Sequence, residues 1–237
     1  MHKPDISRVH QRFQRGLATY SEAAVVQRRM AQTLCASLLQ TTPLRRFGSV
    51  LDLGCGTGLL TDAFASACAW DALYLYDLLD ACQSFHAKRP SASFQKADLN
   101  VYDSYPEADL ILSGATFQWI HDLDALLARL HRVLKPEGLL AFSTFGPENL
   151  KEVHAISDAG LTYIPSQRLS EKLRTAGFEV LLLKESQEVL TFSSPREANG
   201  GCFSCGSRTV QSLPSFEPLK AQVDGSRPGV SLPDVIV

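Results

Sequence analysis

A glycine-rich turn at residues 50–58 (VLDLGCGTG) gives the first indication of how this 237-residue chain folds. The apolar residues before the turn have the length of a buried strand, and a helical stretch follows over residues 59–69. Glycine lets the backbone approach a ligand that a Cβ atom would exclude. We therefore expect a strand–turn–helix unit in which Gly54, Gly56 and Gly58 form a ligand cradle. The alternative is a tight connection without a ligand.

Strand-like and helical stretches alternate along the chain, which predicts an α/β fold. Apolar residues spaced four apart predict a helix over residues 20–40. The expected strands cover residues 49–53, 72–76, 94–97, 110–113 and 139–143, and the other expected helices cover 59–69 and 123–134, the latter stopped by Pro136 and Gly138. Continuous apolar strands alternating with helices indicate a parallel sheet with helices on both faces. A ligand of such a sheet belongs at the carboxyl ends of its strands.

We expect three parts along the chain: an N-terminal helical cap (residues 1–45), a ligand-binding domain (residues 46–197) and an irregular tail (residues 198–237). Near the end of the domain, a helix is predicted over residues 166–176, with strands over 178–183 and 189–192 at the edge of the sheet. From Ala198 the composition turns to Gly, Ser, Cys and Pro, so we expect little order in the tail.

Two aspartates at the ends of expected strands favour a nucleoside ligand. Asp77 ends the second strand, where its carboxylate can accept hydrogen bonds from both hydroxyls of a ribose. Asp98 follows the third strand and is placed to meet an adenine amino group. Either residue alone could be a helix cap. Dinucleotide sites normally have the spacing G-x-G-x-x-G, whereas the third glycine here comes one residue earlier, which argues against a bound pyrophosphate.

The glycine turn resembles the first motif of class I S-adenosylmethionine (SAM)-dependent methyltransferases, hydrophobic-hydrophobic-Asp-hydrophobic-Gly-x-Gly-x-Gly. The resemblance covers residues 45–145 and implies a Rossmann-like sheet with SAM as the cofactor. By this resemblance Asp52 lies near the methionine amino group, Asp77 binds the ribose and Asp98 sits by the adenine. The full set of cofactor-binding residues that it implies is Asp52, Gly54, Gly56, Gly58, Asp77, Leu78, Asp98 and Leu99.

Three other stretches resemble the malonyl-[acyl-carrier protein] O-methyltransferases of biotin synthesis. They are residues 13–20 (FQRGLATY), 117–119 (FQW) and 142–152 (FSTFGPENLKE). This resemblance implies methylation of the free carboxyl of a malonyl thioester, carried by acyl-carrier protein or coenzyme A. It makes Tyr20, Gln118 and Trp119 candidates on the substrate side.

The implied reaction needs few catalytic groups. A carboxylate is ionised at neutral pH, so it requires placement in line with the sulfonium methyl group but no general base. For a hydroxyl substrate the candidate bases are His121, His131 and His154, of which His121, beside Trp119, is expected nearest the mouth of the site. Two other functions remain open: a SAM methyltransferase for another small acid or a quinone, and a non-catalytic remnant of a methyltransferase.

The chain departs from the family's pattern at two places. Where the family usually has Ser-Asn-Ala, this chain has Ser113, Gly114 and Ala115. The match ends at residues 194–197 (SPRE), after which the family continues with a helix that covers the substrate and a last antiparallel strand beside the fifth. We therefore expect an incomplete lid. A shifted reading frame near codon 198 would produce such an abrupt change, and sequencing the coding DNA tests this hypothesis.

Charge and cysteine usage exclude several other classes. A net charge of −2, with Lys and Arg scattered along the chain, predicts neither nucleic-acid nor membrane binding. The sequence has no apolar run of about 18 residues and no apolar signal segment at its start, so the expected compartment is the cytoplasm. Cysteines 35, 55, 68 and 82 lack the spacing of a disulfide framework, and Cys202 and Cys205 form a lone C-x-x-C, so no metal site is expected.

Overall fold

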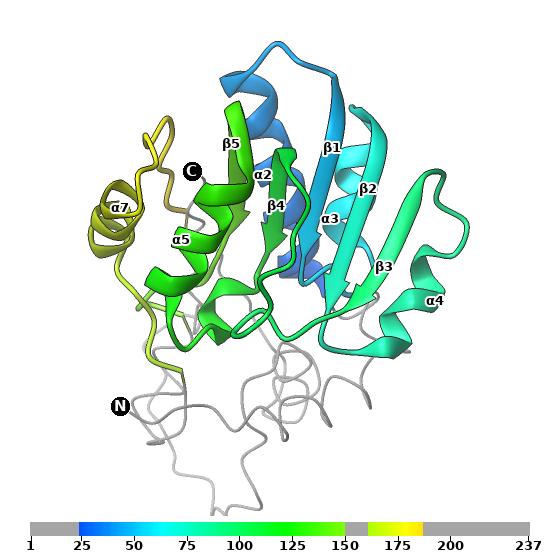
Figure 1. Cartoon of the computed structure of the whole chain (residues 1–237). Helices are drawn as coiled ribbons and strands as arrows, with labels where there is room; N and C mark the ends of the chain where they lie inside the picture. Colours follow the sequence, from blue (N-terminus) through cyan, green and yellow to red (C-terminus); the bar gives the residue numbers. More distant parts are fainter. Residues whose placement is uncertain (1–23, 150–160, 187–237) are drawn as a thin grey trace, which may run out of the picture.

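The structure, a computed structural model, describes residues 24–149 and 161–186 (Figure 1). Several predictions made above fall outside these residues. They concern Tyr20 and the stretch around it, His154, the strand over 189–192, Cys202, Cys205 and the tail.

A sheet of five parallel strands forms the centre of the described structure, in the order β3-β2-β1-β4-β5. The strands are β1 (Arg46–Leu53), β2 (Ala69–Asp77), β3 (Ala92–Lys96), β4 (Ala108–Gly114) and β5 (Leu134–Ser143). This confirms the predicted parallel sheet. The strand order reverses between β1 and β4, so the crevice outside the carboxyl ends of these strands is where an open α/β sheet binds its ligand.

Helices cover both faces of the sheet (Figure 1). The elements are α2 (Val25–Thr41), α3 (Leu59–Ala65), α4 (Gln83–His86), α5 (Leu123–Val133) and α7 (Ser166–Thr175), with short 3-10 turns η1 (Asp80–Cys82) and η2 (Phe117–Trp119). One buried cluster packs α5 and α7 against the sheet, and a second packs α2 and α3 against it. The expected α/β fold with two helical layers is therefore confirmed.

The two cores follow from the alternation of side chains along each strand. On β1, Val50 belongs to the α2/α3 cluster, whereas Leu51 and Leu53 belong to the α5/α7 cluster. On β4, Leu110 and Ile111 divide in the same way. Successive side chains of a strand point to opposite faces of the sheet, so a strand that is buried on both faces must be apolar throughout. This is the reason that these strands could be recognised as continuous apolar runs.

Residues 135–138 lie within β5, whereas we expected them only to end the preceding helix. Helix α5 ends at Val133, and β5 begins at the next residue. Leu134 pairs with Ala108 and Leu139 with Leu110, so the intervening residues form a bulge, with Glu137 at φ 62°. A bulge admits extra residues without ending the strand. Proline and glycine here mark an irregularity in the strand.

The strand predicted over residues 178–183 is wrong, because this segment is not assigned as a strand and pairs with no strand in the part of the chain that the structure describes. Gly177, with a φ of 99°, ends α7 as expected. Beyond it, a groove of about 500 Å³ is lined on one side by β5 and on the other by Gly177, Phe178 and Leu181. Within the described ranges, β5 pairs with β4 alone. An apolar stretch becomes a strand only when a neighbouring backbone supplies hydrogen-bond partners.

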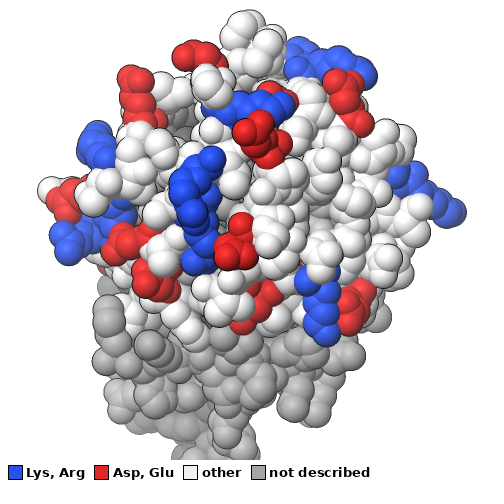
Figure 2. Space-filling model, viewed as in Figure 1, with Lys and Arg blue, Asp and Glu red and all other residues white. Residues whose placement is uncertain are grey.

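The surface of the described chain has little charge segregation. On the face shown in Figure 2, acidic and basic side chains are intermixed and form no continuous patch of one sign. Ion pairs also join opposite charges at the surface, including Lys96 with Asp80 and the half-buried Lys172 with Asp124. None of the helices in residues 24–149 and 161–186 is long and apolar enough to cross a bilayer.

Candidate cofactor-binding site

The glycine loop turns sharply because two of its N–H groups bind the neighbouring strand. Gly54 and Cys55 both donate to the carbonyl of Tyr76, at 2.8 and 3.0 Å. Gly58 then donates to the carbonyl of Cys55 at 2.9 Å and precedes the first residue of α3. The predicted strand–turn–helix unit is confirmed, although α3 ends at Ala65 and is shorter than expected.

Two of the three glycines are required by close packing. A Cβ atom on Gly54 would lie 2.2 Å from Oγ1 of Thr116, and one on Gly58 would lie 2.3 Å from Nη2 of Arg89. Both residues also have positive φ, at 77° and 93°. At Gly56 a Cβ would meet nothing within 4 Å, so this residue borders open space.

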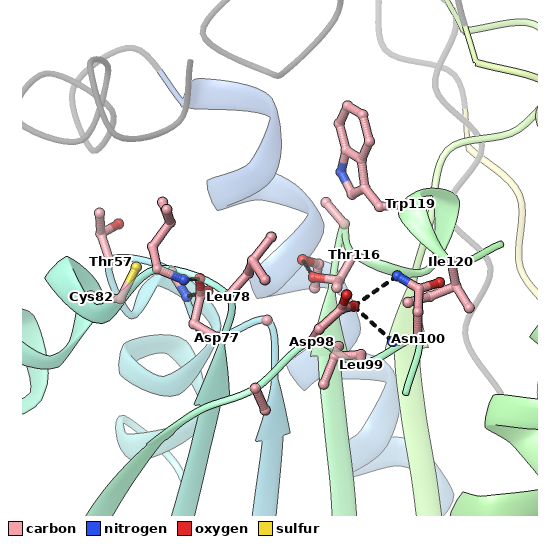
Figure 3. A pocket seen from close by; sticks show the side chains of 16 residues that line it. Thr57, Asp77, Leu78, Cys82, Asp98, Leu99, Asn100, Thr116, Trp119 and Ile120 are labelled. Atoms are coloured by element: carbon pink, nitrogen blue, oxygen red, sulfur yellow. Dashed lines mark hydrogen bonds between the residues drawn. The ribbon is translucent and has the colours of Figure 1, made fainter. Parts of the chain in front are cut away.

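A cavity of about 150 Å³ lies above the loop, at the carboxyl ends of β1, β2 and β4 (Figure 3). Most of the residues expected to bind the cofactor line it: Gly54, Gly56, Asp77, Leu78, Asp98 and Leu99. Further lining residues were not among the predicted site residues, and they include Cys82, Asn100, Thr116 and Ile120. The walls are apolar apart from two carboxylates and a few neutral polar groups, as in many cofactor pockets.

The carboxylate of Asp77 is held by backbone N–H groups. Its Oδ2 accepts from Gly56 at 2.9 Å, and its Oδ1 accepts from Leu79 at 2.9 Å. Burial raises the pKa of this carboxyl, and the two hydrogen bonds oppose that rise. A carboxylate offers about four acceptor positions, so Asp77 can still accept hydrogen bonds from a ligand's hydroxyl groups.

Asp98 is fixed by a side chain that we did not anticipate. Its Oδ1 accepts from the backbone N–H of Asn100 at 3.0 Å and from Nδ2 of Asn100 at 2.9 Å (Figure 3). The Oδ1 of Asn100 in turn accepts from the backbone N–H of His121 at 2.8 Å. Both of these hydrogen bonds use Oδ1 of Asp98, so Oδ2 can accept from a ligand amino group. The Asp-x-Asn spacing could have indicated this arrangement, because an Asp side chain often accepts a hydrogen bond from the backbone N–H of the residue two positions later.

Asp52 lies beneath the loop and lines neither this cavity nor a smaller one on the other side of the loop. Its side chain is fully buried, and its Oδ2 accepts from the hydroxyl of Thr61 at 2.5 Å. Burial raises the pKa of this carboxyl to about 7, and the Thr61 hydrogen bond only partly offsets the effect.

A smaller cavity of about 50 Å³ lies on the other side of the loop, against α2. It shares Gly54, Gly56, Thr57, Gly114 and Ala115 with the larger one, so the two form one bent crevice around the loop. Its outer walls come from Gln27 and Met30 on α2 and from Ser143 at the end of β5. The Ser143 hydroxyl is buried without a hydrogen-bond partner among the described residues. No periodicity in the sequence indicated that Gln27 or Ser143 borders the loop.

The two described substrate-side candidates differ in position. Trp119 lines the larger cavity and stands above it in Figure 3. The Gln118 side chain instead joins two strand ends: it donates to the carbonyl of Ala115 and accepts from the hydroxyl of Thr144 at 3.1 Å.

The described histidines that we considered as bases do not enter the crevice. His121 is exposed, and only its backbone N–H takes part in the Asn100 hydrogen bond. His131 lines the groove beside β5 and packs edge-on against Phe178, with ring centroids 5.1 Å apart.

Comparison with known proteins assigns the chain that carries this crevice to a protein family. A family model described as a methyltransferase domain matches residues 26–183, which include the five described strands and the glycine loop. The malonyl-[acyl-carrier protein] O-methyltransferase of Chlorobium phaeovibrioides is 38% identical over 199 residues, covering 81% of this chain and 76% of the relative. The enzyme of the same name from Haemophilus influenzae is 35% identical over 192 residues, covering 81% and 74%.

The chain belongs to this methyltransferase family. Solved structures agree on the fold: a SAM-dependent methyltransferase of Thermotoga maritima superposes with a TM-score of 0.56 at 18% identity, covering 79% of this chain and 88% of the other. A methyltransferase in complex with the Haloferax volcanii activator Trm112 gives 0.60 at 19% identity, covering 79% and 81%. The expected fold, the methyltransferase class and SAM as the methyl donor are confirmed.

Proposed function

We propose that this methyltransferase transfers the methyl group of SAM to the free carboxylate of a malonyl thioester carried by acyl-carrier protein or coenzyme A. A carboxylate oxygen attacks the methyl carbon, the carbon–sulfur bond breaks, and its electron pair stays on sulfur. The products are a methyl ester and S-adenosylhomocysteine, and no proton is transferred. The support for this acceptor is the 35–38% identity to two relatives of that name over most of the chain.

The bent crevice suggests how the cofactor lies. Asp77 and Asp98 are placed to accept hydrogen bonds from ribose hydroxyls and an adenine amino group, so the adenosine belongs in the larger cavity. The smaller cavity would then hold the methionine part, where the Ser143 hydroxyl could pair with its polar end. Gly114 and Ala115, which border both cavities, would lie near the methyl group that SAM supplies.

The composition of the crevice favours an acceptor that is already ionised. Neither cavity is lined by a histidine, lysine or arginine from the described ranges. A hydroxyl acceptor requires a base near neutral pH, whereas a carboxylate requires none. Placement in line with the methyl group can by itself lower the barrier by about 7–11 kcal/mol. We assign Trp119, at the wall of the larger cavity, to the substrate side. Gln118, the other described candidate, stays a substrate-side candidate whose hydrogen bonds also hold two strand ends together.

The test is an assay of the full chain with SAM and a set of acceptors, with products identified by mass spectrometry. Malonyl-carrier protein and malonyl-coenzyme A are compared with succinyl-coenzyme A, free malonate and a quinol. A gain of one methyl group on the malonyl thioesters alone supports the proposal. Methylation of a different acceptor overturns the choice of substrate. No turnover by a chain that still binds S-adenosylhomocysteine indicates a non-catalytic remnant.

A further inference from the structure

A chain of three side chains lies directly beneath the glycine loop. His86, at the end of α4, is only 4% exposed, and its Nε2 is 3.1 Å from the carbonyl oxygen of Gly56. On the other side of the ring, Nε of Arg89 lies 2.9 Å from Nδ1 of His86. Arg89 also pairs with Asp62 on α3, at 2.6 Å. The network joins α3, α4 and the loop, although none of its three side chains borders the crevice.

The partners of His86 determine its protonation. A guanidinium group can only donate hydrogen bonds, so Nδ1 must accept and carries no proton. The Gly56 carbonyl can only accept, so the proton of the neutral ring is on Nε2. The geometry therefore selects one neutral tautomer. A second proton on Nδ1 would face the N–H of Arg89 and break that hydrogen bond.

The loop is held on both sides at one residue. The N–H of Gly56 donates to Asp77, and the carbonyl of Gly56 accepts from His86. Gly56 borders both cavities, and no neighbouring atom lies within 4 Å of a Cβ placed there, so packing alone does not hold it. These two hydrogen bonds restrain the peptide groups on either side of Gly56, at the border of both cavities.

We infer that neutral His86, fixed by Arg89, is a positioning residue for the glycine loop, and that acidification weakens cofactor binding through it. The inference rests on one part of the proposed function, the binding of SAM in the crevice, and does not depend on which acceptor is methylated. His86 acts through the backbone of Gly56 and touches no reacting atom.

The charged groups around His86 act in opposite directions. Burial lowers the pKa of the ring, and the neighbouring Arg89 lowers it too. The hydrogen bond to Gly56 and the carboxylates of Asp62 and Asp77 raise it. Because the net shift is downward, His86 is neutral at neutral pH and gains its proton only on acidification. At neutral pH the ring is thus held in place by Arg89. As the pH falls through the lowered pKa, Nδ1 loses its hydrogen bond to Arg89 and the ring charge meets the guanidinium, so His86 is no longer fixed although Nε2 can still donate to Gly56.

The test measures binding of S-adenosylhomocysteine by calorimetry from about pH 8 to about pH 5. His86→Gln keeps an amide N–H and a carbonyl oxygen but cannot titrate, so it should bind nearly as well as the wild type at neutral pH and lose less affinity on acidification. His86→Phe removes both hydrogen bonds and should bind about 5- to 30-fold more weakly at neutral pH. His131→Gln removes an exposed histidine remote from the loop and is the matched control.

The comparison between variants reports the loss of the His86 charge, including its effect on the neighbouring Asp77, whereas the titration of Asp52 is common to all of them. Coincident pH profiles for the wild type and His86→Gln would overturn the inference, as would full affinity in folded His86→Phe. If His86→Phe fails to fold, the comparison with His86→Gln still decides. Failure of the methyl-transfer assay leaves this binding test unaffected.

Discussion

The fully buried carboxylate of Asp52 receives its hydrogen bond from the hydroxyl of Thr61, at 2.5 Å, while its other oxygen has no partner among the described residues. A buried carboxyl with one hydrogen bond favours its neutral form, and the pKa rises from 3.8 to about 7. The two residues lie on β1 and α3, on either side of the glycine loop. We therefore expect the contribution of Asp52 to folding stability to depend on pH.

Asp52→Asn should remove part of this pH dependence. The folded state binds the Asp52 proton more tightly than the unfolded state, so the stabilisation is fully present below about pH 4 and is lost as the pH rises through about 7. At 1.36 kcal/mol per unit, the loss is at most about 4 kcal/mol. We expect Asp52→Asn to flatten the decline in free energy of unfolding between these values. Urea unfolding at several pH values measures it, and an unchanged slope contradicts the assignment.

Asp77→Asn should weaken binding of S-adenosylhomocysteine about 10- to 100-fold, because it replaces a charged acceptor by a neutral one. Calorimetry at neutral pH measures the loss. Asp71→Asn is the matched control: Asp71 lies on the same strand, is 59% exposed and pairs with Arg46. Equal affinities for the two variants would show that Asp77 does not contact the cofactor.

Alanine should be far less tolerated at position 58 than at position 56. Gly58 has a φ of 93°, and its added Cβ would collide with Arg89, which is itself held by His86 and Asp62. We expect Gly58→Ala to lower the free energy of unfolding by about 1–3 kcal/mol through backbone strain. Displacement of Arg89 from its ion pair with Asp62 should lower it further. Gly56 has a φ of 50° and open space around it, so Gly56→Ala should lower the free energy of unfolding by only about 1 kcal/mol. Thermal and urea unfolding of both variants test the order, and the reverse order would refute it.

Cys82 should report occupancy of the larger cavity. It lines that cavity, and burial raises the pKa of its thiol, so alkylation of the native protein should be slow. S-adenosylhomocysteine should slow it further, because the ligand covers the sulfur. Peptide mass spectrometry after timed iodoacetamide treatment gives the rate. Cys68, which lies outside the crevice, is the internal reference, and protection of both cysteines alike would indicate a general stabilisation.

The strands that lie inside the sheet, between two other strands, could be predicted from their continuous runs of apolar residues. Residues such as Leu110 and Ile111 are apolar because both faces of a central parallel strand are covered. Residues 178–183 show a similar pattern but form no strand, since the pattern describes burial and says nothing about a hydrogen-bonding neighbour. The bulge at residues 135–138 was missed for a related reason: Pro136 and Gly138 exclude a helix equally well whether the chain turns or continues as an irregular strand.

By itself the sequence determined the alternating order of elements, the glycine loop and the aspartates that end β2 and follow β3. These features depend on spacing within a few residues, which periodicity and backbone sterics govern. Only the tertiary structure decided which distant groups meet at the loop: Ser143 and Gln27 at the smaller cavity, and His86 at the carbonyl of Gly56. Such meetings depend on strand order and helix placement, which arise from packing of the whole sheet and leave no local periodicity in the chain.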